Sequence, residues 1–84
     1  MNKDRRNALA EVESTIDEAI GQIQDVIDEE ADALDGLPES LQDSDRAMAM
    51  NDAIEDMESL IGVLDDFTQK LLDVVKKHTP KKKK

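Results

Sequence analysis

Apolar residues recur every three or four positions along two long stretches of the chain. The first stretch is marked by Leu9, Val12, Ile16, Ala19, Ile20, Ile23, Val26, Ile27, Ala31 and Leu34, and the second by Ala47, Met50, Ile54, Met57, Ile61, Leu64, Leu71 and Val75. This spacing is typical of amphipathic α-helices, because it places the apolar side chains on one side of each helix. The pattern predicts one helix over residues 4–35 and a second over residues 44–77.

The residues between these stretches, 36–43, have the composition of a turn. Gly36 is expected to adopt the left-handed conformation that ends many helices. Leu37 and Leu41 are expected to close the turn end of the core, and Ser44 to cap the second helix, with Asp43 as the alternative cap. A short connection makes the two helices neighbours. The sequence therefore predicts an all-α fold in which residues 1–78 form a single antiparallel, coiled-coil-like two-helix hairpin.

Each apolar stripe is wider than the contact between two helices requires. A two-helix seam uses about two positions in seven, whereas bundles use about three. The widening residues are Ile20, Ile27 and Leu34 in the first stretch and Leu60, Phe67 and Val74 in the second. Two helices alone are expected to leave this strip in water, and a homodimeric four-helix bundle would cover it. The alternative is that the strip binds another protein. The residues predicted for self-association are Ile16, Ile20, Ile23, Ile27, Leu34, Ile54, Met57, Leu60, Ile61, Leu64, Phe67, Leu71 and Val74.

The charge of the chain is strongly negative and unevenly distributed. The 84 residues carry a net charge of −10. Residues 11–69 contain 19 acids and a single base, Arg46, which gives 1 − 19 = −18. A surface of this kind repels nucleic acids and anionic membranes, so we expect the body of the protein to bind neither. The expected partner is a protein with a basic surface; the alternative is that the acids only keep the protein soluble.

The first helix concentrates this acidity. Ten acids lie between Glu11 and Asp35 without one base, so no stabilising Glu–Lys pair can form one turn apart. Rows of carboxylates along a rod imitate the phosphates of a nucleic acid, which predicts a DNA-mimicking inhibitor that occupies a nucleic-acid-binding surface. The residues predicted to bind the partner are Glu18, Asp25, Asp28, Glu29, Glu30, Asp32, Asp35, Asp52, Glu55, Asp56, Asp65 and Asp66. The alternative function is a structural or assembly subunit that oligomerises through its apolar strip.

The sequence offers little support for catalysis or a metal site. Asp28, Glu30 and Asp32 match the first ligands of a calcium loop, but Ala33 replaces the glycine that its sharp turn requires. The one histidine, His78, has no Glu-x-x-His pair as in di-iron proteins and no serine placed beside it. Cysteine is absent, which excludes disulfides and thiolate ligands. We expect a protein that is not an enzyme and binds no cofactor or metal.

The end of the chain and its location follow from simpler signals. Residues 79–84, TPKKKK, are predicted to form a disordered basic tail. No apolar run is long enough to span a bilayer, and no signal-peptide pattern follows Met1. These observations predict a cytoplasmic protein that does not bind membranes.

The stretch LPESLQDSDRAMAMNDAIEDMESLIGVLDDF, residues 37–67, carries a family resemblance. It resembles the connector of a group of small acidic proteins of Gram-positive bacteria and their prophages, in which a similar LPESLQ segment joins two long helices. The match centres on Leu37 to Asp56 and departs at Ala47, where glycine is common in the group. The resemblance implies a helical hairpin and a phage or mobile-element setting, and it supplies neither an activity nor functional residues.

Overall fold

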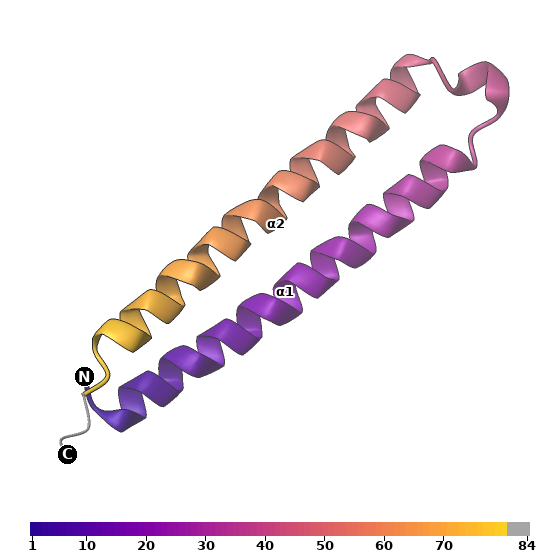
Figure 1. Ribbon diagram of the computed structural model, residues 1–84. Helices are drawn as coiled ribbons and strands as arrows, with labels where there is room; N and C mark the ends of the chain where they lie inside the picture. The colour runs from indigo at the N-terminus through magenta and orange to yellow at the C-terminus, as the bar shows by residue number, and fades with distance from the viewer. Residues whose placement is uncertain (81–84) are drawn as a thin grey trace.

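Two long helices joined by a turn make up the whole fold (Figure 1). The computed structural model describes residues 1–80. Helix α1 spans Lys3–Asp35, a short 3₁₀-helix η1 spans Glu39–Leu41, and helix α2 spans Asp45–Lys77. The chain doubles back at the turn, so the start of α1 and the end of α2 lie at the same end of the rod. The predicted all-α antiparallel hairpin is confirmed, and each helix boundary lies within one residue of its prediction. Of the predicted disordered tail 79–84, residues 81–84 lie outside the described part of the chain.

Polar side chains mark the start of each helix. The Asn2 side chain accepts a hydrogen bond from the Arg5 backbone N–H at 2.9 Å. The Ser44 hydroxyl accepts one from the Ala47 backbone N–H at 3.3 Å and donates to the Leu41 carbonyl at 2.6 Å. These bonds satisfy backbone donors that have no partner within the helix. Ser44, rather than Asp43, is therefore the cap of α2.

The turn ends α1 differently from the sequence prediction. Gly36 has φ −79° and ψ −6°, which is right-handed, so the prediction of a left-handed glycine is wrong. The Gln42 side-chain amide instead donates to the carbonyls of Leu34 and Leu37, at 3.2 and 2.9 Å. The backbone N–H groups of Gly36 and Leu37 also donate to the Asp32 and Leu34 carbonyls. Because these bonds satisfy carbonyls of the last turn of α1, no left-handed residue is needed there. Leu37 is half-buried, but Leu41 is exposed and does not close the core as predicted.

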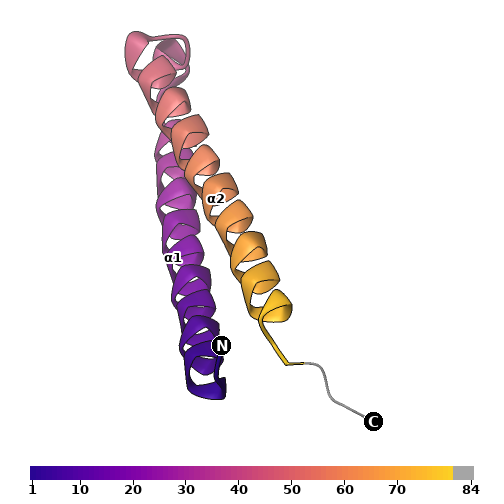
Figure 2. The ribbon, with the colours of Figure 1, turned by 90° about the vertical axis from the view of Figure 1, so that its left-hand side faces the viewer.

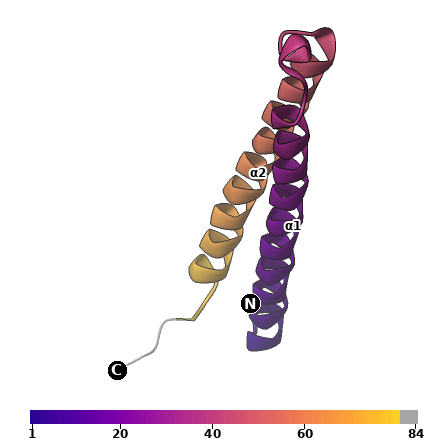
Figure 3. The ribbon, with the colours of Figure 1, turned by 90° about the vertical axis from the view of Figure 1, so that its right-hand side faces the viewer.

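The hairpin is a thin rod. Its principal extents are 69, 17 and 15 Å. The helices lie close together near the turn and diverge toward the termini, as the two side views show (Figures 2 and 3). We call the end with the termini the open end. A rod of this shape has a large surface for its volume and buries little of its chain.

The core between the helices is correspondingly small. Among the described residues, the buried apolar side chains are Ile27, Ala47 and Leu71. Ile27 is only 5% exposed. The prediction that Ile27 belongs to a strip left in water is therefore wrong, because this side chain is buried within the hairpin. Most other core positions remain half-buried, so one hairpin covers its apolar side chains only in part.

Candidate functional site

The carboxylates predicted to bind a partner lie on the outside of the rod. Eleven of the twelve are exposed, and Glu30 is half-buried. They do not form one face: Asp28, Glu29 and Glu30 are consecutive, and successive helical residues point about 100° apart. The structure thus distributes these acids around both helices. We call the twelve residues the acidic coat; its members are Glu18, Asp25, Asp28, Glu29, Glu30, Asp32, Asp35, Asp52, Glu55, Asp56, Asp65 and Asp66.

The acidic coat is not neutralised from within the hairpin. Among residues 1–80, one hydrogen bond between side chains involves a carboxylate: Gln24 Nε2 donates to Asp28 Oδ1 at 3.1 Å. The Arg6 guanidinium donates to the Met1 carbonyl at 2.8 Å instead of an acid. The described residues include no buried charged side chain. The negative charge of the sequence is therefore presented to solvent.

A second surface is apolar. Leu60, Val63, Phe67 and Val74 of α2 are 53, 65, 47 and 42% exposed, and we call them the apolar row. They recur at spacings of three, four and seven residues, which aligns them along one side of the helix. Three belong to the predicted self-association set, and Val63 was missed because its position lies at the edge of the stripe. Large apolar side chains aligned in this way are typical of a protein contact.

The remaining residues predicted for self-association lie deeper. Ile27 and Leu71 are buried within the hairpin. The half-buried members are Ile16, Ile20, Ile23, Leu34, Ile54, Met57, Ile61 and Leu64. The exposed members of the predicted set are therefore Leu60, Phe67 and Val74, all on α2.

Helix α1 contributes apolar residues on the same side of the rod: Val12 and Val26 are exposed, and Ala19 is half-buried. At about 100° per residue, Val12, Ala19 and Val26 lie about 60 to 100° to one side of Ile27. Viewed down α2 from its N-terminus, the apolar row is rotated by about 70 to 130° from the centre of the surface that contacts α1. The direction of this rotation is the same as that of the apolar residues on α1, viewed from the N-terminus of α1. Because the helices are antiparallel and face each other, rotations in the same direction about the two helix axes lead to the same side of the rod. The apolar row and the apolar residues of α1 therefore lie on one side.

We call this side of the rod the open face; it also carries Asp56, about two helical turns before Val63. The opposite side carries Asp17, Gln24, Asp28, Glu58 and Asp65, together with the exposed Leu72.

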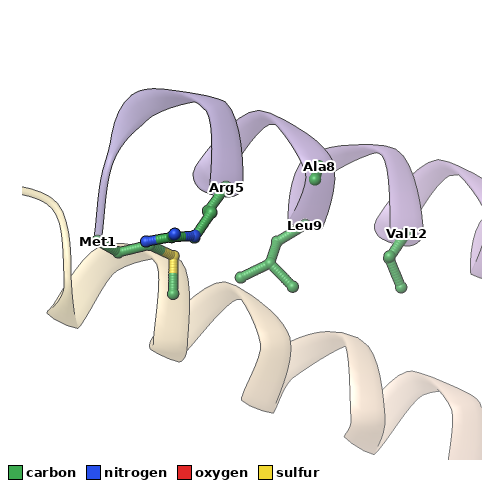
Figure 4. Close-up of a pocket in the computed structure, with 5 residues that line it drawn as sticks. All are labelled: Met1, Arg5, Ala8, Leu9 and Val12. Carbon is green, nitrogen blue, oxygen red and sulfur yellow. The ribbon is translucent and has the colours of Figure 1, made fainter.

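A hollow of about 330 Å³ lies at the open end. Met1, Arg5, Ala8, Leu9 and Val12 of the N-terminal segment line it. The side chains of Met1, Leu9 and Val12 extend toward α2 (Figure 4). The lining is apolar apart from the Arg5 guanidinium. Since Val12 belongs to the open face, the hollow continues that face to the end of the rod.

Other kinds of site find no support in the part of the chain that the structure describes. Its His, Asp and Glu side chains form no group of three or more that could hold a metal ion. Neither described helix has a segment apolar enough to cross a bilayer. The chain matches no protein-family model, and comparisons with curated proteins and with solved structures gave no match.

Proposed function

We propose that this protein is a non-enzymatic binding module that occupies a basic surface of another protein through its acidic coat. One observation carries the proposal. Residues 11–69 hold 19 acids against one base, and no lysine or arginine among residues 1–80 donates a hydrogen bond to a carboxylate. Leaving these charges unpaired costs stability through repulsion between neighbouring acids. A basic partner would offset that cost on binding.

The spacing of the charges fits a partner that otherwise binds nucleic acid. Ten acids of α1 between residues 11 and 35 and seven acids of α2 between residues 45 and 69 share the same length of rod. That length is about 36 Å at about 1.5 Å per residue, so the rod carries one acid per about 2.1 Å. Duplex DNA carries one charge per about 1.7 Å of its axis. The similarity supports an inhibitor that competes with nucleic acid for a basic groove.

The turn sequence adds support of a different kind. Its resemblance to the connectors of small acidic prophage proteins favours a protein of a phage or mobile element that acts on a protein of its bacterial host, in the cytoplasm. In this proposal the rod binds the basic protein without cleaving or modifying it. The expected effect on the partner is loss of nucleic-acid binding.

The test compares two variants with equal net charge. One neutralises part of the acidic coat by Asp28→Asn, Glu29→Gln, Glu30→Gln and Asp32→Asn. The other neutralises four acids outside the coat by Glu11→Gln, Glu13→Gln, Asp17→Asn and Asp73→Asn. Both change the charge from −10 to −6. Immobilised wild-type and control proteins should capture the same basic proteins from bacterial lysate at low salt, and the coat variant should lose them.

Helicity is checked by circular dichroism in all three proteins. Capture that is equal for both variants would contradict a role for the acidic coat, because only the positions of the removed charges differ. Capture of proteins with no basic surface would contradict the proposed kind of partner.

The exposed apolar row supports a second candidate function. A subunit of a homo-oligomer would cover Leu60, Val63, Phe67 and Val74, which the single hairpin leaves in water. In that role the acids serve solubility, and assembly is the function. Self-association is also compatible with the first candidate, since the acidic coat surrounds the rod and remains largely free when the open face is covered.

A further inference from the structure

We infer that a second copy of this chain covers the open face in an antiparallel orientation, with the turn of each copy at the open end of the other. The inference rests on the self-association proposed above and adds the contact face, the orientation and the register. Three features of the rod favour this occupant: the area of the face, the charges at the two ends, and the positions of the exposed apolar residues.

The face has the size that a stable dimer needs. Each helix has 33 residues, which corresponds to a length of about 50 Å. With a width of 17 Å, the face measures about 850 Å² in projection. Stable protein interfaces bury about 800 Å² per partner. A chain with so few buried side chains also gains more from such a contact than a larger domain would.

The charges at the two ends select the antiparallel orientation. Residues 1–10 and 70–80, at the open end, contain six Lys and Arg residues and two acids, which gives +4. Residues 25–56, at the turn end, contain twelve acids and one base, which gives −11. A parallel dimer would place the two turn ends side by side. An antiparallel dimer places each turn end beside a basic end, which replaces repulsion by attraction.

The apolar residues set the register. In a face-to-face antiparallel dimer with two-fold symmetry, α1 packs along α1 of the second copy and α2 along α2. Val12 and Val26 lie seven residues on either side of Ala19. With Ala19 at the two-fold axis, Val12 of each copy meets Val26 of the other. The small Ala19 side chain allows close approach at the axis.

The same axis fits α2. Asp35, the last residue of α1, and Asp45, the first residue of α2, lie on either side of the turn at about the same height in the hairpin. Away from the turn, residue numbers fall along α1 and rise along α2. Residues at the same height therefore have numbers that sum to about 80. The height of Ala19 therefore corresponds to position 61. Leu60 and Val63, two residues of the apolar row, lie next to this height and would contact each other across the axis.

Opposite charges meet in this register. Asp52 and Lys70 lie nine residues on either side of position 61 and project from the same edge of α2, so each pairs with the other in the second copy. Arg5, which lines the hollow, comes within about one helical turn of Glu30 of the second copy. Glu30 is the half-buried member of the acidic coat. The dimer would give Glu30 a basic neighbour, Arg5 of the second copy, that the single hairpin does not provide.

The first experiment measures the mass of the protein by sedimentation over a range of concentrations. The wild-type mass should rise to twice the 9.4 kDa of one chain. Phe67→Asp with Val63→Asp should shift the protein toward monomer. Met48→Asp is the control, since Met48 is 61% exposed but lies on the outer side of α2. A wild-type protein that stays monomeric throughout would overturn the inference, as would a double variant that dimerises like wild type.

The second experiment tests orientation in the otherwise unchanged protein. The chain has no cysteine, so Ser40→Cys in the turn accepts a single spin label. The antiparallel dimer predicts a label-to-label distance of about 50 Å, the length of a helix. The parallel dimer predicts a distance within about 20 Å, two helix diameters. A short distance in the dimer would overturn the antiparallel arrangement.

The third experiment tests the register. Lys70→Glu should weaken dimerisation roughly fivefold, because the charge pair occurs twice in the dimer and becomes a repulsion. Asp52→Lys in the same chain should restore most of that affinity. Arg5→Glu with Glu30→Arg provides an independent pair. Second changes that restore nothing would contradict the register.

These outcomes are separate from the test of the proposed partner. A monomer that captures basic proteins through the acidic coat would refute the dimer and leave the binding function standing. A dimer that captures none would do the reverse.

Discussion

Repulsion within the acidic coat predicts that added salt stabilises this protein. Nine pairs of acids lie three or four positions apart within the helices, where side chains are neighbours. They are Glu13–Asp17, Asp25–Asp28, Asp25–Glu29, Asp28–Asp32, Glu29–Asp32, Asp32–Asp35, Asp52–Glu55, Asp52–Asp56 and Glu55–Glu58. At about 0.2 to 0.5 kcal/mol for each like-charge pair, they destabilise the hairpin by about 2 to 4 kcal/mol.

Salt removes most of this repulsion because it shortens the range of the charges. The Debye length falls from about 30 Å at 0.01 M salt to about 3 Å at 1 M. A change of 1 kcal/mol shifts the melting temperature of a small domain by about 4 to 8 °C. We therefore expect the melting temperature, followed by circular dichroism, to rise by at least about 8 °C over this range of sodium chloride.

Two variants of equal charge separate repulsion from a general effect of salt on the protein. Asp25→Asn, Asp28→Asn, Glu29→Gln and Asp32→Asn together remove five of the nine pairs, and the salt response should fall by about half. Glu11→Gln, Glu18→Gln, Asp43→Asn and Asp65→Asn together remove none of them. If salt leaves the wild-type melting temperature unchanged or lowers it, or if both variants respond alike, the reasoning is refuted.

Three single substitutions, two of them paired with a control substitution, test the packing and the turn by chemical denaturation. Ile27→Ala should lower the free energy of unfolding by about 2 to 5 kcal/mol, whereas Met48→Ala, at an exposed position, should change it by less than about 0.5 kcal/mol; equal effects would contradict the assigned core. Gln42→Leu should cost about 0.5 to 1.5 kcal/mol through the two lost, solvent-exposed hydrogen bonds at the turn, and a neutral effect would argue against that cap. Ser44→Ala should cost about 1 kcal/mol and Asp43→Ala much less, and the reverse order would make Asp43 the cap.

The hairpin was predictable because local signals agree along the chain. Helical spacing, a proline-containing turn and Ser44 as a cap all indicate the same boundaries, and tertiary contacts do not override them. The end of α1 was not predictable in the same way. Gln42 acts on carbonyls five and eight positions earlier in the chain, and no local pattern shows that its side chain folds back while Gly36 stays right-handed.

The surface was predictable only in part. Periodicity identifies an apolar stripe but leaves its centre uncertain, so Ile27 was assigned to the exposed strip and Val63 was not. The rotation of each helix about its axis decides this, and that rotation depends on how both helices pack together. Counting charges gave the excess of acids, whereas their distribution around the rod required the geometry of both helices.

Competition with nucleic acid is the most direct test of the central claim, that the acidic rod occupies a basic, nucleic-acid-binding surface. The wild-type protein is immobilised with its captured partner at low salt, and duplex DNA or RNA is added in increasing amounts. The account predicts that nucleic acid releases the partner in a dose-dependent way, while a neutral polymer does not. A partner that stays bound at saturating nucleic acid would contradict the claim.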